Sequence, residues 1–136
     1  MSKAIFVNLP VADLPRSMAF YEALGFTNHA AFTDETAACM RWSESIMLML
    51  LTHEKWNSFT DRPITPSGSS EVSLALSLDS KSEVDAMADA AAGLGGIADI
   101  NPVQDHSFMY GRDILDPDGH VWGPFWMDPA AIPTAG

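Results

Sequence analysis

The chain has 136 residues, of which 47% are hydrophobic, and this length suits one domain with its own core. Its 18 acidic and 7 basic residues give a net charge of -11, which disfavours binding to nucleic acid or to an anionic membrane surface, because both depend on lysine and arginine. The sequence therefore predicts a single domain over residues 1–136 whose partners are small molecules or proteins.

The cysteine content and the apolar runs indicate where the protein resides. Cys39 is the single cysteine, so no intramolecular disulfide and no cysteine-rich metal site is expected. The apolar run near the N-terminus is too short for a signal peptide, and the longest apolar run, Ile46–Leu51, is too short to cross a bilayer. These features predict a cytoplasmic protein with no membrane partner.

The first half of the chain reads as strand, helix and three strands. Residues 4–11 are rich in branched side chains and predict a strand. Asp13 as an N-cap and Pro15 in the first turn open a helix that Gly25 ends. Residues 26–32, 37–42 and 46–52 predict three short strands separated by turn residues.

The second half repeats this order. Residues 71–79 alternate between apolar and small or polar side chains, and Ser80 with Glu83 forms a capping box that opens a helix. Strands are predicted over 97–104, 109–115 and 121–127, the last two joined by the turn residues 116–119. The sequence thus predicts βαβββ modules over 4–52 and 71–127, with a linker over 53–70.

Several short motifs resemble one known superfamily. They are the Val11-Ala12-Asp13-Leu14 opening with Leu24-Gly25-Phe26, the Leu76-Ser77-Leu78-Asp79 segment, and the Asp116-Pro117-Asp118-Gly119 turn. Together they resemble the vicinal-oxygen-chelate superfamily, which includes glyoxalase I, bleomycin-resistance proteins and extradiol dioxygenases. The ending over 122–129 is similar to that of the bacterial group described as predicted lactoylglutathione lyases.

The resemblance implies an α+β fold in which the two modules pair into a cup-shaped, curved mixed sheet with helices outside. It also implies that the metal ligands of the superfamily's enzymes correspond here to Phe6, Leu50, Ser73 and Gly123. Divalent ions in such sites need imidazole nitrogen or carboxylate oxygen, which none of these four side chains carries. The sequence therefore predicts no metal and no cofactor.

Side chains along a strand alternate between faces, and this alternation predicts what lines the cup. The expected lining is largely apolar with a few hydroxyls and one amide, which suits an aromatic or apolar ligand. Arg112 is a further candidate contact, or an ion-pair partner of Asp105 or Asp113. The predicted ligand-binding residues are Phe6, Asn8, Leu50, Thr52, Ser73, Ser77, Arg112, Gly123 and Phe125, with Leu48, Ala75 and Val121 on the same face.

Three functions remain open from the sequence. The first is metal-independent binding of a small, largely apolar or aromatic molecule, as in the bleomycin-resistance branch that the sequence resembles. The second is a lyase or dioxygenase-type enzyme with an atypical site, for which Asp105, His106 and Tyr110 are the candidate acid–base residues. The third is a non-catalytic module whose cup has closed. The resemblance also implies a homodimer.

Overall fold

Two copies of one strand and helix arrangement make up the architecture. The computed structural model describes residues 3–131, and the chain divides into two compact units, residues 1–69 and 70–136. Among residues 3–131 there is no helix with the length and apolar character that crossing a membrane requires.

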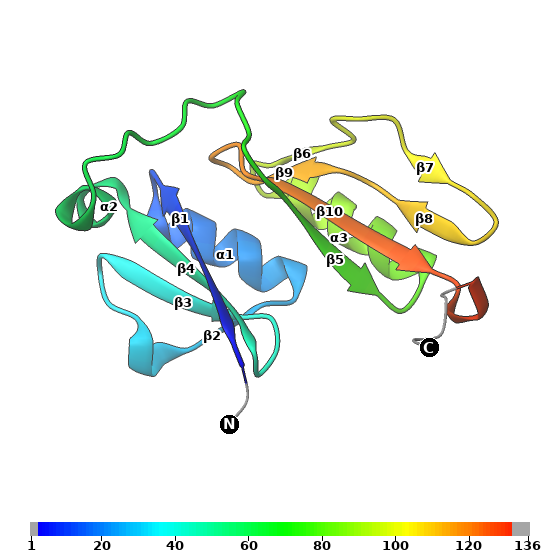
Figure 1. Ribbon diagram of the computed structural model, residues 1–136, viewed down its shortest axis with the longest axis horizontal. Helices are drawn as coiled ribbons and strands as arrows, with labels where there is room; N and C mark the ends of the chain where they lie inside the picture. The colour runs from blue at the N-terminus through cyan, green and yellow to red at the C-terminus, as the bar shows by residue number, and fades with distance from the viewer. Residues whose placement is uncertain (1–2, 132–136) are drawn as a thin grey trace. The chain divides into compact units, whose positions relative to one another are not determined.

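The first unit is a four-stranded sheet with a helix on one face (Figure 1). The strand order is β1-β4-β3-β2, with β1 parallel to β4 and the other pairs antiparallel. In chain order the elements are β1 (Ile5–Val11), α1 (Leu14–Leu24), β2 (Thr27–Asn28), the 3₁₀ helix η1 (Ala30–Phe32), β3 (Ala37–Arg41), β4 (Ile46–Thr52) and α2 (His53–Phe59).

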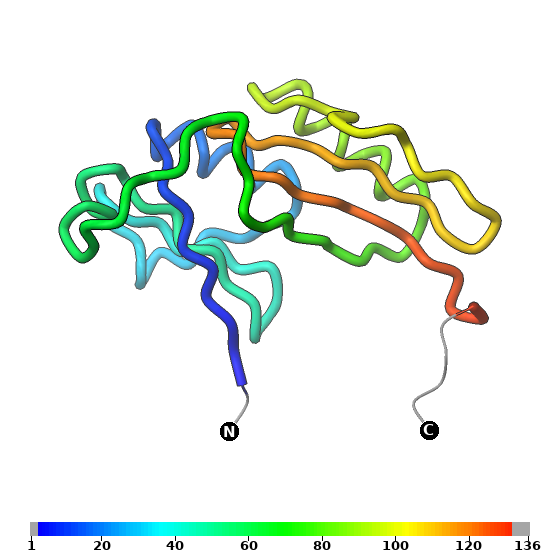
Figure 2. Tube along the Cα trace, turned by 45° about the horizontal axis from the view of Figure 1, so that its top comes forward, coloured from blue at the N-terminus to red at the C-terminus, as the bar shows by residue number. Residues whose placement is uncertain are grey.

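The second unit repeats this topology in shorter pieces. Its elements are β5 (Ser73–Leu78), α3 (Lys81–Gly93), β6 (Ile97–Ala98), β7 (Gln104–Asp105), β8 (Met109–Gly111), β9 (Ile114–Leu115), β10 (Val121–Met127) and the 3₁₀ helix η2 (Pro129–Ala131). Figure 2 shows β10 between β5, its parallel partner, and the path of β8 and β9, which pair antiparallel with it. The predicted α+β class with two βαβββ modules is therefore confirmed.

Both long helices begin and end where the sequence indicates. The Asp13 carboxylate accepts a hydrogen bond from the Arg16 N–H at 3.1 Å, and Gly25 ends α1 with a left-handed φ of 112°. Ser80 Oγ accepts from the Glu83 N–H at 3.2 Å, and Glu83 accepts from the Asp79 N–H at 2.7 Å. These side chains satisfy backbone groups that would otherwise lack partners at the helix ends.

Three predicted strands are wrong in length, and two of them differ because the chain leaves the extended conformation. The strand expected over 26–32 stops at Asn28, because Phe32 N–H and Thr33 Oγ1 both donate to the His29 carbonyl and turn the chain into η1. The strand expected over 97–104 splits into β6 and β7. Asp99 interrupts it at a left-handed φ of 59°, a conformation that short polar side chains tolerate better than branched ones.

A proline divides the strand predicted over 109–115. In the register of β10, Pro124 lies opposite Arg112, whose N–H donates to the Pro124 carbonyl at 3.1 Å. Proline has no N–H to return the second bond of this pair, so β8 and β9 are separate strands along β10.

The segment predicted as linker over 53–70 contains a helix. Thr52 Oγ1 accepts from the Lys55 N–H at 3.1 Å and caps α2, whose Trp56 and Phe59 rings lie 6.1 Å apart. This helix is hard to see in the sequence because it directly follows β4. Thr52 is both the last residue of the strand and the N-cap of the helix.

Strand register decides which side chains of the first unit enter its core. β1 pairs with β4 so that Leu9 lies beside Leu50, while Asn8 lies beside Met49. Leu48 and Leu50 are fully buried, whereas Phe6 is 54% exposed. The prediction that Leu48 and Leu50 share a face with Phe6 and Asn8 is therefore wrong. The residues of β4 on that face are Met47, Met49 and Leu51.

The second unit has the predicted faces. Ser73, Ala75 and Ser77 of β5 pair in register with Val121, Gly123 and Phe125 of β10, so these six residues share one face. The opposite face carries Leu76 and Trp122, which are buried together with the α3 side chains Val84, Met87, Ala88 and Ala91. One face of this sheet therefore belongs to the core, and the other carries four small side chains together with Val121 and Phe125.

Candidate functional site

A pocket of about 170 Å³ lies on the second unit's sheet. The neighbouring strands β5, β8 and β10 supply small residues to this pocket. At Gly111 even a Cβ would lie 3.4 Å from the Phe125 Cβ, which is a tight contact. Large side chains at these positions would fill the space. The lining residues are Ser73, Ala75, Gln104, Met109, Gly111, Arg112, Asp113, Gly123, Pro124 and Phe125.

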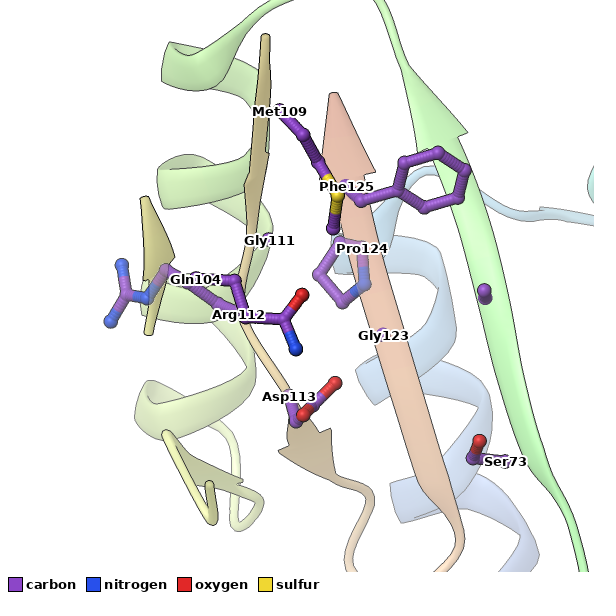
Figure 3. Close-up of a pocket in the computed structure, with 10 residues that line it drawn as sticks. Ser73, Gln104, Met109, Gly111, Arg112, Asp113, Gly123, Pro124 and Phe125 are labelled. Carbon is purple, nitrogen blue, oxygen red and sulfur yellow. The ribbon is translucent and has the colours of Figure 1, made fainter. Parts of the chain in front are cut away.

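Asp113 places a carboxylate inside this pocket (Figure 3). Its Oδ1 lies 2.9 Å from the point that a Cβ on Gly123 would occupy. Its Oδ2 accepts a hydrogen bond from Asn101 Nδ2 at 3.0 Å. The carboxylate thus takes up the space that any side chain at position 123 would need.

The predicted ligand-binding residues divide between the two units. Ser73, Gly123 and Phe125 line the pocket, and Ser77 pairs with Phe125 on the same face. In the first unit, Phe6 and Asn8 are exposed on β1. Leu50 belongs to the core, and Thr52 caps α2. The structure therefore brings the predicted second-unit residues together on one face and gives Leu50 and Thr52 structural roles.

Arg112 lies at the pocket wall, but its guanidinium points away from the pocket (Figure 3). It donates to Asp85 Oδ1 at 3.0 Å and, through Nε and Nη2, to both carboxylate oxygens of Asp99 at 2.9 and 2.8 Å. Its partners are therefore Asp85 and Asp99 instead of the predicted Asp105 or Asp113. This placement gives Arg112 a structural role on the face that packs against α3.

The candidate acid–base residues lie around the β7–β8 hairpin. Asp105 and Tyr110 are partners in register, and Lys81 is 3.8 Å from Asp105. Tyr110 donates to Asp85 Oδ1 at 2.6 Å, and this bond raises the tyrosine pKa. The His106 ring stacks on Phe108 with centroids 5.6 Å apart. A tyrosine with a raised pKa is a poor proton donor near neutral pH, so this contact does not favour Tyr110 as an acid–base residue.

The donor set does not fit the divalent ion that the fold resemblance implies. The predicted ligand positions are Phe6, Leu50, Ser73 and Gly123. The strand register places Met49, instead of Leu50, on the same face of the first unit as Phe6, and the second unit offers Ser73 and Gly123. None of these has an imidazole or carboxylate. Within residues 3–131, moreover, no three His, Cys, Asp or Glu side chains are grouped as a metal site would need.

Comparisons with known proteins agree with this fold. Residues 3–43 match the family described as bleomycin resistance protein-like N-terminal. A glyoxalase/bleomycin resistance protein/dioxygenase family enzyme from Burkholderia phytofirmans superposes with a TM-score of 0.75 at 17% identity, over 93% of this chain and 99% of that one. Residues 3–43 thus resemble this family in sequence, and the chain as a whole has the fold of the glyoxalase/bleomycin resistance/dioxygenase proteins.

Two further solved structures have the same fold. A glyoxalase/bleomycin resistance protein from Albidiferax ferrireducens gives a TM-score of 0.69 at 23% identity, covering 89% of this chain and 95% of that one. A fosfomycin resistance protein from Mesorhizobium loti gives 0.66 at 14% identity, covering 96% of both chains. Identities this low establish the fold and nothing about the ligand. No curated protein matches the sequence.

Sequence reasoning missed Asp113 and Gln104 as residues of the pocket. The turn residues at 116–119 could have revealed Asp113, because a hairpin turn fixes how the two flanking strands pair. In the structure the Asp116 N–H donates to the His120 carbonyl at 3.0 Å, so these two residues are opposite each other. Counting back along both strands from that pair puts Asp113 opposite Gly123. No comparable local signal exists for Gln104, because β7 follows an irregular segment.

Proposed function

We propose that this protein binds a small, largely apolar or aromatic molecule in the pocket of the second unit, without a divalent metal. The observation that carries the proposal is the pocket itself, which Phe125 and Asp113 border and into which Gly111 and Gly123 extend no side chain. A small concave site with apolar walls and few polar groups is the usual form of a small-molecule site.

The proposal favours binding over catalysis. Lyase and dioxygenase chemistry in the vicinal-oxygen-chelate superfamily, which the sequence resembles, uses a metal. The residues of this chain at the corresponding ligand positions have no imidazole or carboxylate to bind one. The alternative acid–base residue Tyr110 is engaged with Asp85 on the α3 side of the sheet. A lyase or dioxygenase-type activity therefore finds no support in the geometry of the second unit.

Filling the pocket is expected to abolish binding. We expect benzyl alcohol, used as a neutral aromatic probe, to shift the backbone amide NMR signals of Gly111 and Gly123 in a saturable way, and EDTA to leave the titration unchanged. Gly123→Leu should weaken binding at least about tenfold, because the new side chain enters the pocket and pushes on Asp113.

Gly93→Leu is the matched control, since nothing lies within 4 Å of a Cβ there and α3 ends at this residue. A well-dispersed spectrum of each variant shows that the fold persists. Equal binding by Gly123→Leu and the parent protein would refute the pocket as the site. Loss of binding on EDTA treatment would refute the metal-free part of the proposal.

We also propose that the protein is a cytoplasmic homodimer. The exposed apolar side chains Ile5 and Phe6 on the edge strand β1 support an interface. The buried Cys39, whose thiol pKa burial raises, suits a reducing compartment. Sedimentation velocity is expected to give the mass of two chains, and Phe6→Glu should shift the protein to monomer. A monomer at high micromolar concentration would contradict the dimer.

A further inference from the structure

The pocket carries a negative charge that no neighbouring cation neutralises within residues 3–131. The Asp113 carboxylate faces the pocket, and its one side-chain partner is the neutral amide of Asn101. Arg112 is adjacent in sequence, but its ion pairs are made to Asp85 and Asp99. The charge of Asp113 is thus available to a ligand.

The two oxygens of this carboxylate differ in their surroundings. Oδ2 accepts the Asn101 hydrogen bond, whereas Oδ1 is directed at Gly123 and accepts no hydrogen bond from residues 3–131. A carboxylate oxygen that accepts no hydrogen bond can form a charge-assisted bond with a cationic donor, and such bonds are roughly twice as strong as those between neutral groups. Such a position favours a cation over a neutral hydroxyl.

The pocket is polar at one end and apolar at the other (Figure 3). The Gln104 carboxamide points toward the same end as Asp113 and adds a neutral polar group there. Met109 and Phe125 form the opposite end. A molecule with one aromatic ring and one protonated amine matches both this division and the volume of about 170 Å³.

We propose that the pocket selects ligands carrying a protonated amine, which Asp113 Oδ1 binds through a charge-assisted hydrogen bond while the apolar body lies against Met109 and Phe125. This inference rests on the proposed function. It adds a class of ligand, aromatic or apolar primary amines, and one residue that recognises it. The net charge of -11 also raises the local concentration of such cations around the protein.

Three probes of equal size test the inference: benzylamine, benzyl alcohol and benzoate, each titrated near neutral pH and followed at the Gly111 and Gly123 amides. Benzylamine should bind at least about tenfold more tightly than benzyl alcohol, and benzoate should bind more weakly than either. Asp113→Asn keeps the size of the side chain and an acceptor for Asn101. In this variant the affinity for benzylamine should fall to within about twofold of the affinity for benzyl alcohol.

Asp61→Asn is the control for long-range attraction, because it removes the same charge at an exposed position in the first unit. It should leave the ratio of benzylamine to benzyl alcohol affinity unchanged. Equal affinity of these two probes for the parent protein, or an unchanged ratio in Asp113→Asn, would overturn the inference while leaving pocket binding intact. If none of the three probes shifts the pocket amides, the proposed function fails together with the inference.

Discussion

Leu50→Glu should strongly destabilise the first unit, whereas Met49→Glu should leave its stability nearly unchanged. Leu50 is completely buried and lies between Leu9 of β1 and Ala38 of β3 in the register of the sheet. A carboxylate there has no partner among apolar neighbours, so we expect a loss of more than about 4 kcal/mol in the free energy of unfolding. Domain stabilities are typically only about 5–15 kcal/mol.

Met49 points to the other face, beside Asn8, and is only half-buried. The same substitution at this position should cost about 1 kcal/mol or less, because the carboxylate keeps contact with water. Hydrogen–deuterium exchange at the β3 and β4 amides measures the stability of the first unit in both variants. Comparable protection in Leu50→Glu and Met49→Glu would mean that the register between β1 and β4 is not the one described.

Removing the Arg112 side-chain charge should be the most damaging single change in the second unit outside its apolar core. Arg112 is 14% exposed and connects α3, through Asp85, to the segment after β6, through Asp99. Arg112→Met keeps much of the aliphatic stem but leaves two carboxylates without their partner. Because those carboxylates are 48% and 37% exposed, water compensates part of the loss, and we expect about 2 kcal/mol.

The acid dependence of this loss identifies its origin. Hydrogen bonds from Tyr110 and Arg112 lower the pKa of Asp85, and the Arg112 hydrogen bonds lower that of Asp99. A lowered folded-state pKa adds stability that is complete above the unfolded value of about 3.9 and is lost as the pH falls through the folded value. The difference between the parent protein and Arg112→Met should therefore be full at neutral pH and shrink below about pH 4.

Chemical denaturation at several pH values, followed by hydrogen exchange in α3 and β8, measures this difference. Asp89→Asn is the matched control, since Asp89 is 79% exposed and 3.8 Å from Arg112, and it should cost about 0.5 kcal/mol or less. A deficit in Arg112→Met that stayed constant into acid would show that lost packing, instead of the ion pairs, causes the destabilisation.

Local chemistry was readable from the chain alone. The caps at Asp13 and Ser80, the left-handed glycine after α1 and the turn at 116–119 depend on residues within a few positions of one another, and all are found where predicted. The faces of β5 were also predictable, because its apolar and small residues alternate strictly. These features were sufficient for the α+β class and the two βαβββ modules.

Tertiary structure decided the rest, wherever one stretch of sequence was compatible with more than one arrangement. The run Ile46–Leu51 is apolar at every position, so no alternation reveals which side chains face inward, and only pairing with β1 places Leu50 in the core and Met49 outside. Arg112 finds its partners 27 and 13 residues away because α3 packs against its strand. In that packing the Arg112 guanidinium forms ion pairs with Asp85 and Asp99. Asp113 is the next residue and lies on the opposite face, so its carboxylate is the charged group that faces the pocket.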